Sequence, residues 1–177
     1  MNTTSTSHLP NLLNNPPLVL ESETRIRFQD CDPFGHLNNA AFFNLLINAR
    51  EDQLMEHYGW DLYAFSKTMG TGWVVGKHEI IYRKPALVHE MVRVRSQLIF
   101  NGPKNLLVEL AMYDSKDSHL KAILWTTFVH VDLKTGRPVP HHEDLQPFLS
   151  AVTKPAGHER LHDRVKEIEL GMAGGLN

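Results

Sequence analysis

The sequence predicts an α+β fold in which an antiparallel sheet of about five strands wraps around one long helix. Three observations lead to this prediction. A helical pattern spans residues 39–58, four segments with alternating apolar residues follow one another after Gly72, and short polar turns join these segments. Such turns suffice for antiparallel strands, whereas parallel strands need long crossover connections.

The first strand is expected over residues 24–29, where apolar and polar residues alternate and Phe28 belongs to the buried face. In residues 39–58 the charged side chains appear only in the second half, so the helix should be nearly enclosed at its start. Asn38 is the predicted N-cap and Gly59 the predicted end, because these residue types satisfy helix termini.

The four later strands share a two-residue period, which predicts a meander. They are expected over residues 74–83, 92–98, 106–113 and 121–131, with helices over 143–152 and 158–170. The sheet face turned away from the long helix would carry Val75, Ile81, Ile123 and Trp125 among its charges. An apolar face of this kind is unusually large for a monomer, so we expect at least a dimer.

The chain of 177 residues fits one domain, expected over residues 23–152. Residues 1–22 are interpreted as a flexible lead-in, and 153–177 as a helical extension with a tail. The net charge of −2 and the lack of a Lys/Arg run give no reason to expect nucleic acid or a membrane as partner. A single cysteine and the lack of a signal-like or membrane-spanning segment favour the cytoplasm.

Chemistry is expected where the first strand meets the long helix. Residues 30–39 read DCDPFGHLNN and place two carboxylates, an imidazole and two amides on one short loop. Such loops between rigid elements commonly carry functional residues. Asp30 is expected to accept hydrogen bonds from its own turn. Cys31 has no imidazole placed by sequence to activate it, which argues against a nucleophilic thiol.

This order of elements and the loop motif resemble the hotdog fold, and more narrowly acyl-CoA thioesterases of the 4-hydroxybenzoyl-CoA thioesterase type. Two further segments match the family, IYRKPA at residues 81–86 and FVHVD at residues 128–132. The resemblance covers residues 24–150. Relatives that act on aromatic acyl groups carry bulky residues at positions 36–39, so an aromatic substrate is not implied here.

The resemblance implies a catalytic role for Asp32, the second carboxylate of the Asp-x-Asp pair. A carboxylate near a thioester carbonyl can attack it directly or deprotonate an attacking water. His36 and Asn38 would shape the loop around the thioester. Structural hydrogen bonding at the helix start explains His36 equally well, and for Asn38 the helix cap is expected first and substrate contact second. The family's backbone donor to the carbonyl oxygen falls on Gly72, with Trp73 next to it.

The implied reaction is hydrolysis of an acyl-CoA, or of an acyl carrier protein thioester, without a metal or other cofactor. Exposed cations at strand ends, namely Arg83, Lys84 and Lys104, are candidates for binding coenzyme A. The expected assembly is a homodimer or homotetramer. Two alternatives stay open, a hotdog protein that binds an acyl thioester without turnover and an enoyl-CoA hydratase.

Histidine pairs raise the question of a metal. His158 and His162 have the i, i+4 spacing of zinc ligands, and His141 and His142 are adjacent. No third ligand is evident beside either pair, so the sequence favours solvated histidines over a metal site.

Overall fold

The computed structural model describes residues 9–10 and 15–174, and its centre is one antiparallel sheet. The strand order is β1-β3-β4-β5-β2. The strands are β1 (Leu20–Arg25), β2 (Thr71–Tyr82), β3 (Met91–Asn101), β4 (Asn105–Asp114) and β5 (Leu120–Asp132).

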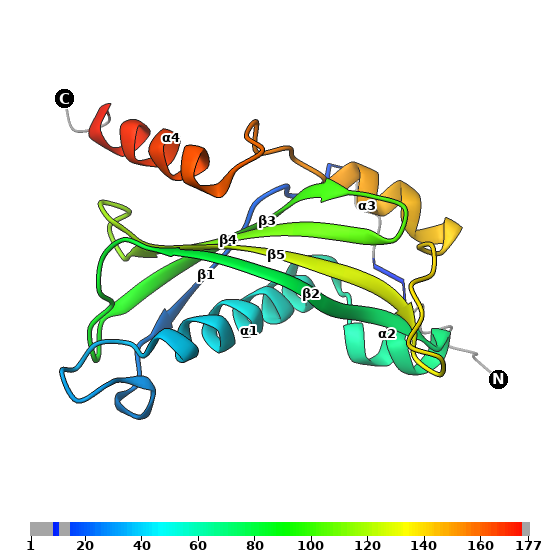
Figure 1. The fold of residues 1–177 in the computed structure, drawn as a ribbon, viewed down its shortest axis with the longest axis horizontal. Helices are drawn as coiled ribbons and strands as arrows, with labels where there is room; N and C mark the ends of the chain where they lie inside the picture. Colours follow the sequence, from blue (N-terminus) through cyan, green and yellow to red (C-terminus); the bar gives the residue numbers. More distant parts are fainter. Residues whose placement is uncertain (1–8, 11–14, 175–177) are drawn as a thin grey trace.

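The long helix α1 (Asn39–Tyr58) lies on one face of the sheet, and α4 (Leu161–Gly174) lies on the other (Figure 1). Shorter elements are η1 (Phe28–Asp30), α2 (Leu62–Met69), η2 (Glu143–Leu145) and α3 (Gln146–Val152). The architecture confirms the predicted α+β fold. Helix α2 was not predicted.

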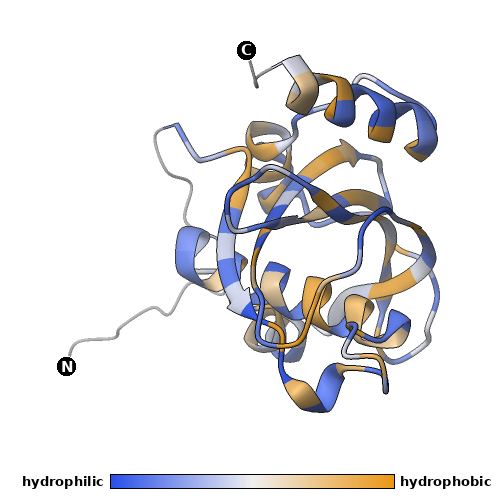
Figure 2. Ribbon diagram, turned by 90° about the vertical axis from the view of Figure 1, so that its left-hand side faces the viewer, coloured by the Kyte–Doolittle hydropathy of each residue, from blue (hydrophilic) through white to orange (hydrophobic). Residues whose placement is uncertain are grey.

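Helix α1 begins and ends at the predicted residues. The Asn38 side chain accepts a hydrogen bond from the backbone N–H of Ala40 at 3.0 Å, as an N-cap does. Gly59 adopts a left-handed conformation with φ 61°, and its N–H bonds back to Met55. The apolar residues of α1 and of the strands gather between helix and sheet (Figure 2). This main core includes Phe42, Leu46, Val94, Val108 and Leu124.

Strand β1 starts four residues earlier than predicted, and the expected strand over 24–29 is wrong. Phe28 is 80% exposed and lies in η1 instead of on a buried face. Leu20 is fully buried, while Glu21 bonds to Arg95 and Glu23 to Arg93 on the neighbouring strand. These cross-strand ion pairs fit the observed register, in which Glu21 lies opposite Arg95 and Glu23 opposite Arg93, about 70 positions away in the sequence.

Strand β2 is a sheet edge, and a β-bulge between Val75 and Lys77 changes which of its residues face α1. Before the bulge, Trp73 packs toward the helices; after it, Ile80 does, while Ile81 faces the other side. The uninterrupted alternation predicted for this strand is therefore wrong in its first half, because a bulge inserts one extra residue into the ladder. Val74 and Val75 remain exposed at 46% and 47%.

The chain's own C-terminal segment covers the outer sheet face. Leu161 and Val165 of α4 are buried against Ile123, Trp125 and other residues of a second core. The extension therefore covers a face of the sheet. In the sequence, the apolar residues of this outer face indicated a dimer. That basis for a dimer is corrected, because α4 of the same chain covers most of those residues.

Candidate functional site

The loop between η1 and α1 is held by the carboxylate of Asp32. Asp32 Oδ1 accepts hydrogen bonds from the backbone N–H of Phe34 at 2.9 Å and of His36 at 3.0 Å. Gly35 takes a left-handed φ of 76°, which closes the turn. No hydrogen bond to Oδ2 occurs in the described part of the chain. One carboxylate oxygen thus fixes the side chain, and the other is available for chemistry.

Asp32 lines an open cleft of about 310 Å³, here called the Asp32 cleft. The walls come from the loop, from the first turn of α1 and from the end of β2. They include Asp32, His36, Asn39, Tyr82, Lys84 and Pro85. The structure therefore brings Asp32 and His36 together with the residues that end the second predicted strand.

The N-terminus of α1 opens onto the same cleft. Asn39 is the first residue of the helix and one of the cleft residues, and its N–H has no hydrogen-bond partner among the described residues. The first N–H groups of a helix lack intrahelical acceptors and carry partial positive charge. A carbonyl oxygen that gains negative charge could be stabilised at this position.

Asn38 lies beside this cleft without lining it. Its amide oxygen caps α1, and its side chain borders a separate shallow hollow with Asp30 and Cys31. The turn-bonding role expected of Asp30 belongs to the Asp32 side chain, whereas Asp30 accepts from Asn38 through its backbone oxygen. Burial and the two adjacent carboxylates raise the pKa of Cys31, which disfavours a thiolate nucleophile.

Gly72 and Trp73 lie at the opposite end of β2 from the Asp32 cleft. Gly72 pairs with Val131, whereas Tyr82 pairs with Ala122, and the strand between them spans roughly 30 Å. Gly72 is also buried, and a Cβ there would lie 2.8 Å from Ser66 Oγ. Within one chain the structure does not bring Gly72 to the carboxylate of Asp32.

The three candidate cations divide between the two ends of the sheet. Arg83 borders the Asp32 cleft, but both arms of its guanidinium bond to Glu169 of α4, at 2.6 and 2.9 Å. Lys84 is exposed at the cleft. Lys104 lies at the Gly72 end, where its Nζ is 3.4 Å from the backbone oxygen of Pro138.

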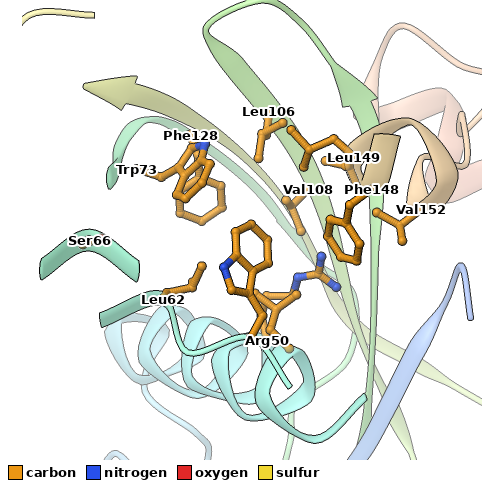
Figure 3. Close-up of a pocket in the computed structure, with 13 residues that line it drawn as sticks. Arg50, Leu62, Ser66, Trp73, Leu106, Val108, Phe128, Phe148, Leu149 and Val152 are labelled. Carbon is orange, nitrogen blue, oxygen red and sulfur yellow. The ribbon is translucent and has the colours of Figure 1, made fainter. Parts of the chain in front are cut away.

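A second hollow, here called the apolar cavity, lies between the second half of α1, α2, α3 and the sheet (Figure 3). Its volume is about 140 Å³. Aliphatic side chains make up most of its wall. The wall also holds four aromatic residues and one cation, namely Trp60, Trp73, Phe128, Phe148 and Arg50. The cavity was not predicted from the sequence, because its wall comes from seven separate helices and strands whose apolar residues have the pattern of ordinary core residues.

Histidines gather beside the apolar cavity. Trp73 Nε1 donates to His141 Nε2 at 3.1 Å, and the buried ring of His130 lies 4.8 Å from the Trp73 ring. Burial, followed by the neighbouring His130, lowers the pKa of His141 to about 4. Within the described residues, no group of three His, Cys, Asp or Glu side chains is placed to hold a metal ion.

Comparison with known proteins identifies the family. A family model described as "Thioesterase-like superfamily" matches residues 26–149. The chain belongs to this superfamily. The enzyme is a thioester hydrolase of the hotdog type. The long-chain acyl-CoA thioesterase FadM of Escherichia coli K12 is 26% identical over 136 residues, which cover 76% of this chain and all of FadM.

Solved structures of thioesterases share the fold. The probable thioesterase YbaW of Escherichia coli has a TM-score of 0.66 and 25% identity, and the match covers 76% of this chain and 99% of YbaW. Slr0204 of Synechocystis, a 1,4-dihydroxy-2-naphthoyl-CoA thioesterase, has a TM-score of 0.67 at 16% identity, over 76% and 95% of the two chains.

The family match covers strands β2–β5, α1 and the residues of the Asp32 cleft, but it begins after β1 and ends before α4. In this thioesterase the segment after residue 149 therefore contains the helix α4 that covers the outer sheet face. It also contains Glu169, which accepts hydrogen bonds from Arg83. None of the described helices is long and apolar enough to cross a bilayer.

Proposed function

We propose that this thioesterase hydrolyses an acyl-CoA to the free carboxylic acid and coenzyme A, with Asp32 as nucleophile or general base. The observation that supports this most is the environment of Asp32. One oxygen accepts two backbone hydrogen bonds, and the residue lines an open cleft at a helix N-terminus. A fixed carboxylate in an accessible cleft is suited to attack a carbonyl or to activate water.

In this mechanism the thioester carbonyl lies between Asp32 and the first turn of α1. The N–H of Asn39 donates to the carbonyl oxygen as negative charge develops there, and the helix dipole adds to this stabilisation. His36 borders the same cleft and contributes to orienting the thioester or the water. Asn38 acts through the helix cap, which holds Asn39 in place. An acyl carrier protein thioester remains the alternative substrate.

We also propose that the enzyme is a homodimer that pairs through β2. This edge strand has no neighbour on its outer side in the described chain and exposes Val74 and Val75. Antiparallel pairing of two copies would bring the Gly72 end of one strand next to the Tyr82 end of the other. The candidate residues that are separated within one chain, including Lys104, would then approach the Asp32 cleft of the partner copy.

A tetramer formed by stacking sheet faces is disfavoured, because α4 covers the outer face. A monomeric mass in sedimentation equilibrium at micromolar protein would contradict the homodimer. The cytoplasm remains the proposed compartment on the basis of the single cysteine.

The test of the catalytic assignment is Asp32→Asn, assayed by release of free thiol from a panel of acyl-CoAs. The amide is neither a base nor a comparable nucleophile, so we expect kcat to fall by roughly a thousandfold or more. The matched control is Asp30→Asn, which removes the same charge two residues away and should keep kcat within a few-fold. Unchanged turnover by Asp32→Asn, with a native circular dichroism spectrum, would refute the role of Asp32.

A further inference from the structure

Arg50 occupies a position where a charge is costly. It extends from the buried side of α1 into the apolar cavity, beside Val108 and Phe148 (Figure 3). The side chain is partly buried and forms part of the cavity wall. Apart from Ser66, the other wall residues are aliphatic or aromatic, and Arg50 makes no hydrogen bond to any of them in the described part of the chain.

The charge of Arg50 has no counter-ion within the described residues, where none of the ion pairs involves it. The segments outside that description, residues 1–8, 11–14 and 175–177, contain no Asp or Glu. Burial lowers the pKa of Arg50 to about 10, so the side chain is still a cation at neutral pH. A buried charge without a partner is destabilising, and such a charge is commonly matched by a bound ion or ligand.

A chain of hydrogen bonds orients the guanidinium. Gln53 is fully buried and donates to Ser22 Oγ at 2.8 Å and to the Val94 backbone oxygen at 3.0 Å. Its amide oxygen accepts the hydroxyl hydrogen of Ser96, and Ser96 Oγ in turn accepts from Arg50 Nη1 at 3.0 Å. This chain occupies one of the five N–H donors of the guanidinium. The others remain available toward the cavity.

We propose that the apolar cavity binds the carboxylate end of a small apolar group, with Arg50 as the residue that recognises the anion. The volume of about 140 Å³ is close to that of an apolar protein cavity of about 150 Å³ that accepts benzene. The bound group therefore has a body of about six carbon atoms. A planar guanidinium is the cation best matched to a carboxylate.

The carboxylate that Arg50 binds could come from two sources. One is a free carboxylic acid, such as the product of thioester hydrolysis. The other is a carboxylate at the tail of an acyl-CoA, which would make Arg50 a specificity residue. The second source rests on the proposed function. Asn39 and Arg50 are roughly 16 Å apart along α1, so an acyl group of about twelve carbons is the appropriate length for a test.

The first experiment measures binding of benzoate by isothermal titration calorimetry, with benzamide as the neutral isostere. Wild type should bind benzoate at least tenfold more tightly than benzamide. Arg50→Met should weaken benzoate binding by roughly ten- to a hundredfold and leave benzamide unchanged, since it removes a charged hydrogen-bond donor. The control is Arg137→Met, which removes an exposed cation outside the cavity and should bind benzoate as wild type does.

The thermal stability of Arg50→Met distinguishes a ligand-binding role of Arg50 from a structural role. Replacing an unpaired buried charge by methionine should leave the unfolding midpoint unchanged or higher. The proposal is overturned if wild type binds benzoate no better than benzamide, or if Arg50→Met binds benzoate as wild type does. The first comparison needs no variant, so it remains decisive even if Arg50→Met fails to fold.

The second experiment distinguishes the sources by comparing hydrolysis of dodecanedioyl-CoA and dodecanoyl-CoA. If the acyl tail carries the carboxylate, wild type prefers dodecanedioyl-CoA, and Arg50→Met reverses the ratio of kcat/KM. If a free acid is the ligand, the ratio is the same in both proteins, and benzoate inhibits only wild type. A failure of the Asp32 assignment leaves the calorimetric result unaffected, so the two proposals can fail separately.

Discussion

Removing Arg164 should destabilise the fold and weaken the packing of the C-terminal helix, because it leaves a buried carboxylate without its counter-ion. Glu109 lies in the outer core with 4% exposure. It accepts hydrogen bonds from Arg164 at 3.0 Å, from Trp125 Nε1 at 2.9 Å and from Gln97 at 3.0 Å. After Arg164→Met, the two neutral donors remain and the compensating charge is gone.

The magnitude follows from this geometry. Breaking a buried ion pair by removing one partner costs about 3–5 kcal/mol. Two remaining donors and the partial exposure of Arg164 place the expected loss near the lower end, about 3 kcal/mol. For a chain of this size, the corresponding fall in the unfolding midpoint is roughly 6–12 °C. The double variant Glu109→Gln/Arg164→Met should recover at least half of the loss, since no buried charge is left.

The assay is urea denaturation followed by tryptophan fluorescence, which also reports local detachment of α4 because Trp125 lies beneath it. Arg160→Met is the matched control on the same helix. Its side chain is 80% exposed and pairs with Asp163, so its loss should change stability by about 0.5 kcal/mol or less. An Arg164→Met protein within 0.5 kcal/mol of wild type, or a double variant less stable than the single one, would refute this reasoning.

Three further predictions concern other parts of the fold. Gly72→Ala should destabilise by about 1–3 kcal/mol, because its Cβ would lie 2.8 Å from Ser66 Oγ, and Ser66→Ala should rescue it in chemical denaturation. An unrescued loss would mean that the oxygen contact is not the cause. Asn38→Ala should cost about 1 kcal/mol through the lost cap, whereas Asn38→Asp should retain both stability and kcat. A large fall in kcat for Asn38→Asp would point to a direct role in the reaction. Stability should decrease by about 2 kcal/mol between pH 7 and pH 5 through His141. The folded state holds this residue neutral down to a pKa of about 4, so the unfolded state takes up the proton first as the pH falls below about 6.5. Denaturation curves of His141→Gln should show a smaller change over the same pH range, and an identical change would exclude His141 as the source.

Several features of the fold follow from local sequence alone. Alternation predicted β3, β4 and β5 because neighbouring residues on a strand face opposite sides whatever lies beyond. The bounds of α1 were predicted by Asn38 and Gly59, since a cap acts within one helical turn. The loop at residues 30–39 was recognised as chemically rich from its composition. The structure adds that Asp32 lines an accessible cleft there.

Other features depend on contacts between distant segments. The start of β1 depends on its pairing with β3, where Leu20 is buried and Glu21 and Glu23 lie opposite arginines, and no local pattern contains that pairing. The bulge in β2 is a property of the β2–β5 ladder, so a regular alternation concealed it. Gly72 matched the family pattern in sequence. It lies far from Asp32 within one chain because the two residues are at opposite ends of β2.

By itself, the sequence determined the class of fold, the long capped helix and the polar loop that precedes it, because each arises from interactions within a few residues. Only the tertiary structure showed that α4 covers the outer sheet face and that Arg50 extends without a counter-ion into an apolar cavity. Both depend on which distant side chains share a space. Burial and the pairing of charges are decided by packing, and the order of residues along the chain does not specify them directly.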